Sequence, residues 1–478
     1  MNFKENEINS KLLDICVEGT ELYLVGGYIR DVLLCKECFD LDYCVKGESA
    51  IDFARKAADA LEGYFVLLDE KHDIARVVLQ DKITVLDFAG CVGGDIFADL
   101  KNRDYTINAI AFSLVPSPHS TPNIADNFKS FLIDPLNGIE DLKNKTIRAV
   151  SEENIMDDPL RILRAYRFAA QLNFSIEEKT FKFIKKHKLL INNVSVERIT
   201  QELIKLFESE HAGEQLYVMK EARFLDEILP ELTPQRQVPP NLHHHLGLLD
   251  HSIESVIQLE KEIKKFPDWS KEHFNREFSQ GIKAISLMKL AMLLHDLGKP
   301  STWNIDEEGR HRFIKHEEIG SEMVFEVLKR LKFSKNSMKY ISKLIKYHMY
   351  PSQLLNDGIE YLTEKAMMRM FRRIGNDMPE LLLISMSDRL SAKGVEITDE
   401  IISNNVNGLY FLLEQYKKTQ EEVKTLPKFA DGRDVMEIRK LSAGPQIGKI
   451  LNELKEAQIS GDISTREQAL EFIKTFEL

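Results

Sequence analysis

The sequence contains no long hydrophobic run and few cysteines. None of its segments approaches the roughly 18 uncharged apolar residues of a membrane-spanning helix, so we expect no membrane domain. The N-terminal stretch MNFKENEINS is polar and lacks the apolar core of a secretory signal. The chain has 5 cysteines, all before residue 100, and this odd, clustered set indicates reduced thiols in a cytoplasmic protein.

The sequence also lacks a net positive charge. Its formal net charge is −12, with 29% charged and 43% hydrophobic residues, as in soluble globular proteins. Nucleic-acid binding needs only a local basic patch, because salt screens charges over roughly 8–10 Å. An RNA substrate is therefore not excluded. At 478 residues, we expect two to four domains.

One stretch near the N-terminus contains three elements in close succession. Leu22–Val25 is an apolar run that predicts a short buried strand, and Gly26 and Gly27 interrupt it. Tyr28–Leu34 then has helical spacing. The glycines leave backbone N–H groups accessible at a helix start, where a triphosphate can approach.

The segment that follows, Phe39–Val45, alternates polar and apolar residues and predicts a half-buried strand. This period places Asp40 and Asp42 on one face of the strand. Two adjacent carboxylates repel each other unless a divalent cation lies between them, and nucleotidyl transfer uses such pairs to hold two metal ions. The alternative is an acidic strand beside a Gly-Gly turn that binds no metal. The ordered combination of glycines, Arg30-Asp31 and D-x-D favours the metal site.

GGYIRDVLL followed by DLD resembles the first motif of the class II tRNA nucleotidyltransferase and bacterial poly(A) polymerase family, within the DNA polymerase beta superfamily. The segment from Asp99 to Phe112 resembles the second motif, with Asn102 in place of its first arginine. The resemblance implies that Mg²⁺ is held by Asp40 and Asp42. It also implies a set of triphosphate and ribose contacts: Gly26, Gly27, Arg30, Arg103 and Asn108. Whether Asp87, near the end of a predicted strand at Ile83–Phe88, adds a third carboxylate stays open.

Asp157-Asp158-Pro159-Leu160-Arg161 resembles the fourth motif, with aspartate in place of its first glutamate. Asp158 before Pro159 also fits a helix cap. Asp158 and Arg161 are three residues apart on one helix face, and Arg164 extends the row. The resemblance implies that this row reads the base edge of the incoming nucleotide, since a carboxylate and a guanidinium complement cytosine and adenine. Two further segments, Asp134–Gly138 and Val196–Leu203, resemble the third and fifth motifs.

The second half of the chain carries a separate histidine and aspartate pattern. It runs in the order His251, His295-Asp296, His316, His348 and Asp388. A His-Asp pair within the apolar segment LLHDLGKP needs a buried partner, and imidazoles with carboxylates suit a divalent metal. The pattern resembles the HD phosphohydrolase superfamily. The resemblance implies a second divalent metal site at His251, His295, Asp296 and Asp388.

We therefore expect an α+β fold in four parts. These are a polymerase beta-like nucleotidyltransferase head (1–150), a helical neck with base-reading and RNA-binding elements (151–235), an HD-type body (236–395) and a helical, tRNA-binding tail (396–478). The implied function is addition of CCA to tRNA 3′ ends from CTP and ATP with Mg²⁺. The segment between Asp42 and Arg103 is short and has no arginine-rich loop, so CC-only addition remains open, as do A-only and poly(A) addition. The alternative from another class of enzyme is that the chain is an HD-type metal-dependent phosphohydrolase.

Overall fold

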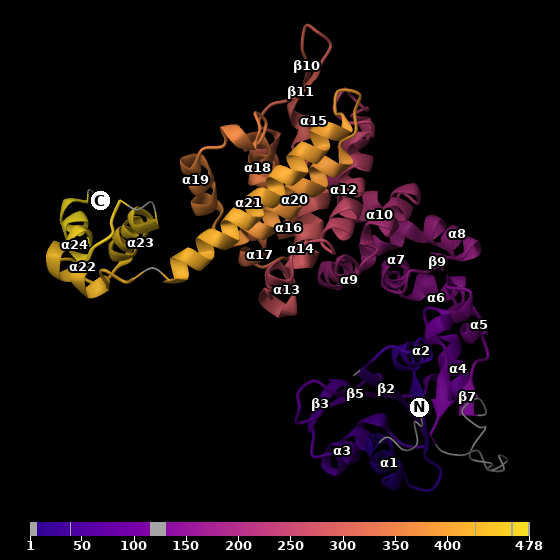
Figure 1. Cartoon of the computed structure of the whole chain (residues 1–478). Coiled ribbons are helices and arrows are strands. Elements are labelled where there is room, and N and C mark those ends of the chain that lie inside the picture. The colour runs from indigo at the N-terminus through magenta and orange to yellow at the C-terminus, as the bar shows by residue number, and fades with distance from the viewer. Residues whose placement is uncertain (1–6, 39, 115–130, 426, 460–461, 477–478) are drawn as a thin grey trace. The chain divides into compact units, whose positions relative to one another are not determined.

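The computed structural model describes residues 7–38, 40–114, 131–425, 427–459 and 462–476 (Figure 1). The chain divides into two compact units, one of Met1–Lys346 with Ser391–Val395 and the other of Tyr347–Leu390 with Glu396–Leu478. A sheet at the N-terminus is followed by helices, which confirms the expected α+β class. Among the described helices, none is both long and apolar enough to cross a membrane. The four-part division of the chain stays a prediction.

A seven-stranded sheet, in the order β3-β4-β5-β2-β1-β6-β7, forms the centre of the head. Strands β2 and β5 run parallel, and the other neighbours run antiparallel. The strands are β1 (Glu21–Val25), β2 (Asp40–Lys46), β3 (Tyr64–Asp69), β4 (Ile74–Val78), β5 (Val85–Gly90), β6 (Ala111–Ser113) and β7 (Leu132–Ile133). The predicted strand–helix–strand unit around Gly26 is confirmed as β1, α2 (Gly27–Leu33) and β2.

Helices cover this sheet because their apolar faces match its buried side chains. Helix α3 (Ala50–Ala60) contacts β4 and β5 through buried residues that include Phe53 and Ala57. Ser49 caps that helix by accepting from the Asp52 N–H. The other head helices are α1 (Glu7–Asp14), α4 (Ile96–Lys101) and α5 (Gly138–Lys143).

The structure corrects one expectation about the cysteines. Cys44 on β2 and Cys91 after β5 are joined by a disulfide, with their Cα atoms 5.4 Å apart. The prediction of reduced thiols is therefore wrong for this pair. Cys16, Cys35 and Cys38 are free, as predicted. The disulfide links the strand that carries Asp42 to the segment that follows β5.

From residue 151 the first unit is almost entirely helical. Its neck helices are α6 (Glu152–Asp157), α7 (Leu160–Leu172), α8 (Glu178–His187), α9 (Val196–Glu208), α10 (Ala212–Glu221) and α11 (Leu225–Ile228). Two short strands, β8 (Thr146–Ile147) and β9 (Ser175–Ile176), pair beside α7. Helix α7 packs on α9 and α10, so Arg161 and Arg164 lie on a helix that its neighbours fix in place, while Asp157 ends α6 and Asp158 precedes α7.

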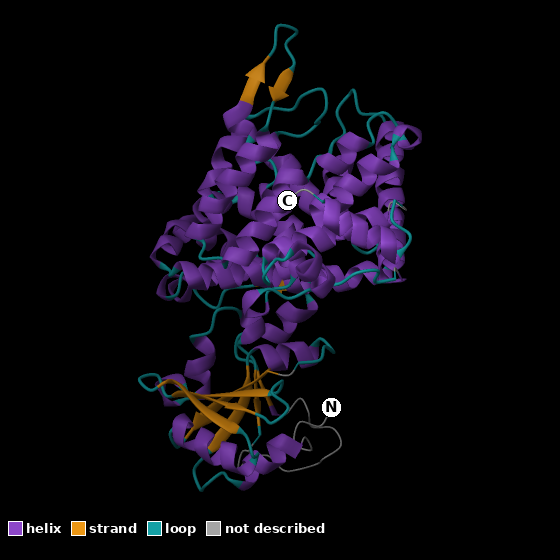
Figure 2. Cartoon of the chain, turned by 90° about the vertical axis from the view of Figure 1, so that its left-hand side faces the viewer, coloured by secondary structure: helices purple, strands orange, loops and turns teal. Residues whose placement is uncertain are grey.

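Helices α12 and α14 form the part of the body that belongs to the first unit, together with the elements around them. These elements are α12 (Leu248–Glu262), α13 (Lys271–Asn275), α14 (Ala284–Leu294), α15 (Lys299–Thr302), β10 (Trp303–Ile305), β11 (His311–Phe313), α16 (His316–Arg330) and α17 (Lys335–Tyr347). Every side chain of α14 except the half-buried Ile285 is buried, as expected for this apolar segment, but the helix ends at Leu294. His295 and Asp296 therefore lie in the turn after the helix and not inside it. Strands β10 and β11 form a hairpin that extends from the helices (Figure 2).

The described residues of the second unit form helices joined by loops and turns, with no strand among them. Its helices are α18 (Tyr350–Leu354), α19 (Glu364–Ile374), α20 (Met378–Ser391), α21 (Asp399–Thr425), α22 (Gly432–Arg439), α23 (Pro445–Ile459) and α24 (Arg466–Thr475). The last three pack on a small core of their own that includes Val435, Ile450 and Ile473. Asp431 and Thr465 begin two of these helices with capping boxes, which fixes the helix starts.

Candidate active sites

The head places three carboxylates on two neighbouring strands. Asp42 on β2 lies opposite Asp87 on β5 in parallel register, and Asp40 lies two residues before Asp42 on the same strand face. Burial raises the pKa of Asp42 to about 6, and the neighbouring carboxylates of Asp87 and Asp40 add to the rise while Arg103 opposes it. Such a cluster of oxygen ligands suits a divalent cation, which would relieve the repulsion.

Asp87 already has a cationic partner. Arg76 on β4 donates to both of its carboxylate oxygens, at 2.7 and 2.8 Å. A bidentate pair of this kind holds the carboxylate in a fixed orientation beside Asp42. The proximity of Asp87 to Asp42 therefore agrees with the open prediction of a third carboxylate. Its pairing with Arg76 was not foreseen from the sequence.

Gly26 brings the first and second motifs into contact. Its φ of +73° is a backbone conformation that only glycine adopts without strain. A Cβ atom at this position would lie 2.9 Å from a guanidinium nitrogen of Arg103 and 3.2 Å from Asp42 Oδ2. Arg103 itself is held by Asp99 at 3.0 Å. The structure thus brings Gly26, Asp42 and Arg103 together, and Gly27 begins the adjacent helix. Their roles in binding metal and triphosphate stay predictions.

A hydrogen-bonded chain connects the other predicted triphosphate contacts. Arg30 donates to Asn108 at 2.8 Å, Asn108 donates to Asp104 at 3.0 Å, and Arg164 donates to the other oxygen of Asp104 at 2.8 Å. Although burial opposes ionisation, the Arg164 guanidinium and the Asn108 amide hold the pKa of Asp104 below its usual range. The guanidiniums of Arg30 and Arg164 each lie 5.2 Å from the ring centre of Phe168. Arg30 and Arg164 are therefore connected through Asn108 and Asp104, and both contact the Phe168 ring.

Asp158 lies at the start of α7, where it has two roles. Its Oδ1 accepts from the Leu160 N–H at 3.3 Å, which supports the predicted cap. Its Oδ2 accepts from Arg198 on α9 at 2.9 Å. Arg198 is 52% exposed, so this pair is weakly held.

Arg161 is engaged with the main chain rather than with Asp158. Its guanidinium donates to the carbonyl of Asn154 at 3.0 Å and to that of Asn102 at 2.8 Å. Asn102 follows α4 and Asn154 lies in α6, so Arg161 links the head to the neck. The base-reading role of this helix face stays a prediction.

A second cluster of metal-ligand type lies in the body. Ligand atoms of His251, His295 and Asp296 lie within 4.8 Å of one another, and all three residues are buried. His316 joins them, because its Nε2 lies 3.4 Å from Asp296 Oδ1. Lys299 Nζ lies 2.7 Å from Asp296 Oδ2. The predicted ligands His251, His295 and Asp296 are thus brought together. The fourth predicted ligand, Asp388, is half-buried on α20 in the second unit, and its role stays a prediction.

The imidazoles of this cluster are oriented by their Nδ1 atoms. The Nδ1 partners are Met292 O for His295 (2.7 Å), Phe313 O for His316 (2.8 Å) and Ser391 Oγ for His251 (3.1 Å). A carbonyl only accepts, so His295 and His316 carry a proton on Nδ1, and their Nε2 atoms face Asp296 at 3.2 and 3.4 Å. Metal-binding histidines in proteins are held in this way. The donor set therefore fits a divalent transition metal.

Close backbone packing brings His316 to the His-Asp pair. A Cβ atom on Gly298 would lie 2.2 Å from the carbonyl oxygen of His316, so only glycine allows the chain after Asp296 to approach α16. The sequence marked His316 as part of the histidine pattern but did not assign it as a ligand.

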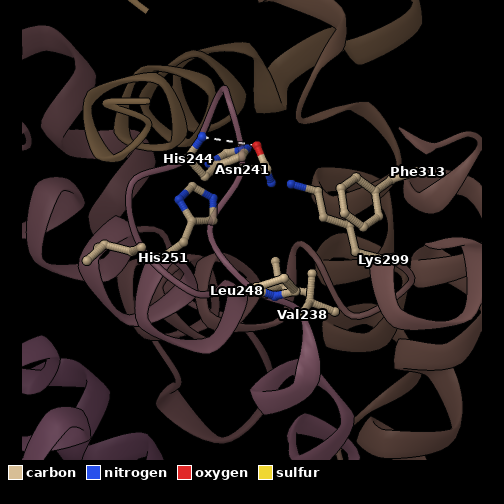
Figure 3. Close-up of a pocket in the computed structure, with 9 residues that line it drawn as sticks. Val238, Asn241, His244, Leu248, His251, Lys299 and Phe313 are labelled. Carbon is tan, nitrogen blue, oxygen red and sulfur yellow. Dashed lines mark hydrogen bonds between the residues drawn. The ribbon is translucent and has the colours of Figure 1, made fainter. Parts of the chain in front are cut away.

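A small cavity lies beside this cluster (Figure 3). Its polar lining residues are Asn241, His244, His251 and Lys299, and its apolar ones are Val238, Pro239, Leu246, Leu248 and Phe313. Asn241 Oδ1 accepts from the backbone N–H groups of His243 and His244, at 2.9 and 3.2 Å. This fixes the amide so that its NH₂ group is turned away from those N–H groups.

The sheet, the paired aspartates and the Gly-Gly turn together define a nucleotidyltransferase head, and a His-Asp metal cluster follows in a helical domain. Three family models match in the same order. Residues 22–148 match the poly A polymerase head domain, 173–236 the probable RNA and SrmB-binding site of polymerase A, and 248–393 the HD domain. The chain belongs to the tRNA nucleotidyltransferase and poly(A) polymerase family whose members carry an HD domain.

Curated relatives match over nearly the whole chain. An A-adding tRNA nucleotidyltransferase of Deinococcus radiodurans is 29% identical over 94% of both chains. A CC-adding tRNA nucleotidyltransferase of Thermus thermophilus is 29% identical over 95% of this chain and 93% of its own. Among solved structures, the Thermotoga maritima CCA-adding enzyme complexed with tRNA has a TM-score of 0.59 at 22% identity, and covers 98% of this chain and 97% of its own. At that identity, the structural likeness shows the fold.

Proposed function

We propose that this chain adds the 3′-terminal CCA sequence to tRNA from CTP and ATP, as a Mg²⁺-dependent nucleotidyltransferase of the cytoplasm. The observation that carries the proposal is that Arg103 and Asp42 both lie against Gly26, so close that they leave no room for a Cβ atom there, while Asp40 and Asp87 lie beside Asp42. The Thermotoga neighbour is described as bound to tRNA, and another CCA-adding enzyme structure, which is 23% identical, as bound to ATP. The predicted tRNA-binding role of the tail belongs to this proposal.

Each part of the head and neck has a role in this reaction. Asp40 and Asp42 would hold the metal ions, which when bound polarise the α-phosphate and favour ionisation of the RNA 3′-hydroxyl. That hydroxyl attacks the α-phosphorus, and diphosphate leaves. Arg30 and Arg103 would bind triphosphate oxygens, because guanidiniums supply planar donor pairs. Asp158 and Arg161, with Arg164 beside them, would select the base.

One structural feature favours CC-only addition as the second candidate within this family. Strands β3 and β4 are joined by the short turn Glu70–Asp73, in which the Asp73 N–H donates to Glu70 O at 3.3 Å. The segment between Asp42 and Arg103 therefore contains compact strands and turns and no long loop. Three relatives that match at 26–36% identity are named CC-adding.

The test is to incubate the purified chain with tRNA that ends before CCA and with CTP, ATP or both, and then to sequence the 3′ ends. CCA ends with both nucleotides support the proposal. CC ends that ATP does not extend would replace it by the CC-only activity. Ends with one A, made only on tRNA that already carries CC, or long A tails would replace it by A addition or poly(A) synthesis.

We propose metal-dependent phosphoester hydrolysis as a second, separable function of the body. The observation that favours it is the set of Nε2 atoms of His251, His295 and His316 around Asp296. His295→Ala should abolish metal-dependent hydrolysis of phosphomonoesters and cyclic phosphodiesters while nucleotide addition survives. No hydrolysis by the parent with magnesium, manganese, nickel or cobalt would reject this function. Equal loss of both activities in a folded variant would contradict the separation.

A further inference from the structure

The sheet of the head has a covered face and an open face over β3, β4 and β5. Helix α3 contacts these three strands from one side (Figure 1). On that side the ring centres of Phe53 and Phe88 lie 5.5 Å apart. The Arg55 guanidinium of the same helix lies 4.2 Å from the ring centre of Phe65 on β3. Side chains alternate between the two faces along a strand, so the neighbours of Phe88 and Phe65 project from the other, open face.

The open face continues from the carboxylates to the edge of the sheet. Two rows of residues in register cross β2, β5, β4 and β3 in that order, namely Asp42, Asp87, Arg76 and Val66, and Asp40, Val85, Val78 and Tyr64. Residues that lie opposite each other project from the same face. At the far end of the rows Tyr64 is 60% and Val66 42% exposed. We call Tyr64, Val66 and Arg76 the edge patch.

The predicted triphosphate contacts lie on the opposite side of β2 from the edge patch. Gly26 and Gly27 follow β1, which pairs with the edge of β2 away from β5, and Arg103 lies against Gly26. In nucleotidyl transfer the attacking and leaving oxygens lie in line, on opposite sides of the phosphorus. Because diphosphate would leave on the β1 side, the RNA 3′-hydroxyl must arrive on the β5 side. The nucleotides that precede it then lie over β4 and β3.

The chemistry of the edge patch suits a single strand of RNA. Arg76 uses its Nε and Nη2 atoms for Asp87, and its side chain is 40% exposed, so N–H donors remain for a phosphate. Tyr64 presents an exposed ring, and single-stranded bases stack on such rings. Three strand spacings, about 14 Å, separate β2 from β3, which a short run of nucleotides can span.

We propose that the edge patch binds the single-stranded 3′ end of the RNA substrate, with Arg76 against a backbone phosphate and Tyr64 stacked on a base. The RNA would thus cross the open face on its way to the carboxylates. This inference names residues for the substrate of the proposed nucleotidyl transfer, and it rests on that proposed function.

A fluorescent base tests the stack without metal or turnover. The probe is tRNA that ends in the first C of CCA, with 2-aminopurine as the nucleotide before that C, titrated in the presence of a chelator. Stacking on tyrosine should quench the bound probe in the parent. Tyr64→Phe keeps the ring and should quench as well. Tyr64→Ala should leave the bound probe several-fold brighter than in the parent.

Leu67→Ala is the matched control, because Leu67 is 44% exposed on the same strand but belongs to the α3 face. It should quench the probe like the parent. In nucleotide addition, Tyr64→Ala should raise the KM for tRNA about tenfold, or about 1.4 kcal/mol, because one stacked base is lost. The KM for CTP should stay unchanged, since CTP would bind on the other side of β2. Leu67→Ala should change neither KM.

The phosphate contact is tested by the salt dependence of tRNA binding. Arg76→Gln should lower the slope of log Kd against log salt by about 0.7, as expected for one phosphate of a single strand. An unchanged slope would overturn the contact with Arg76.

Several results would overturn the stack on Tyr64. These are equal quenching by Tyr64→Ala and the parent, equal effects of Tyr64→Ala and Leu67→Ala, or an equal rise of the KM values for tRNA and CTP. If Tyr64→Ala instead converted a dimer to a monomer, the face would join two copies of the chain and the proposal would be wrong.

The same preparations separate this inference from the proposed function. Normal nucleotide addition without any dependence on Tyr64 would leave the function and reject the edge patch. Quenching that depends on Tyr64, in a chain that adds no nucleotide to any tRNA, would support RNA binding at the edge patch and reject the function.

Discussion

Replacing Asp42 with asparagine should abolish nucleotide addition and at the same time stabilise the metal-free head. Burial and the carboxylates of Asp87 and Asp40 raise the pKa of Asp42 from 3.8 to about 6, so its ionised form opposes folding. A rise of about two units corresponds to about 3 kcal/mol for a fully buried group. Asp42 is half-buried, and solvent screening reduces the expected gain in the free energy of unfolding to about 1–2 kcal/mol.

The sign of the pH dependence follows from the direction of the shift. A carboxyl group whose pKa is higher in the folded state favours folding while it is protonated, and this contribution is lost as the pH rises from 3.8 through 6. Asp42→Asn keeps the uncharged state at every pH. The gain in the free energy of unfolding of the variant over the parent should therefore be absent below pH 3.8 and complete above pH 6.

This effect is measured by hydrogen exchange of peptides from β2 and β5 over a urea series. Tryptophan fluorescence would not report unfolding of the head, because both tryptophans lie outside it. The samples contain a chelator. Adding Mg²⁺ should then stabilise the parent and not the variant, since a ligand that binds only the folded state shifts the equilibrium toward it. Asp59→Asn, at an exposed position of α3, is the control and should change stability by less than about 0.5 kcal/mol. A less stable variant above pH 6, or equal Mg²⁺ stabilisation of both chains, would refute the reasoning.

Three other substitutions test the remaining contacts. Gly26→Ala should lower nucleotide incorporation more than tenfold in a folded chain, because its Cβ would meet Arg103 and Asp42; a near-normal rate would show that the turn adapts. Arg161→Ala should slow addition of CTP and ATP and let UTP and GTP compete roughly ten- to hundredfold better, measured by competition on one tRNA; equal slowing of all four would point to a structural role. His316→Ala should lower the metal content of the purified chain while nucleotide addition stays near normal, and an unchanged metal content would remove His316 from the ligand set.

Local periodicity predicted the elements of the head well. The apolar run before Gly26 and the alternation around Asp40 became β1 and β2, and the predicted strand at Ile83–Phe88 became β5 with a shift of two residues. These patterns succeed because each reflects the burial of a single element. The pairing of Asp87 with Arg76 and the Cys44–Cys91 disulfide depend on the order of strands in the sheet, which no single element encodes.

The metal cluster shows the same division between local and non-local information. The apolar surroundings of His295 and Asp296 predicted a buried pair with partners. His316 could be assigned as a ligand only once the close approach of α16 to Gly298 was known. In the sequence, the one sign of this approach is the glycine in LLHDLGKP. The Nδ1 atoms that orient the imidazoles donate mainly to main-chain carbonyls. Every residue has such a carbonyl, so the residue pattern could not predict these hydrogen bonds.

The spacing of Asp158 and Arg161 predicted a shared helix face, but this is wrong, because Asp158 has extended backbone before α7 and only Arg161 lies on the helix. Their different partners also mean that the two residues are not equivalent as candidate base readers. The ion pair of Asp158 with Arg198 is partly exposed and contributes at most about 1 kcal/mol, so an incoming base can displace it at little cost. Arg161 has five N–H donors, and the two carbonyls of Asn102 and Asn154 use only some of them. It can therefore contact a base without losing its link between head and neck. Replacing Arg161 removes both functions together. Asp158→Ser keeps the helix cap while deleting the carboxylate, so a loss of discrimination in that variant assigns a part in base selection to the carboxylate of Asp158 and not to its cap.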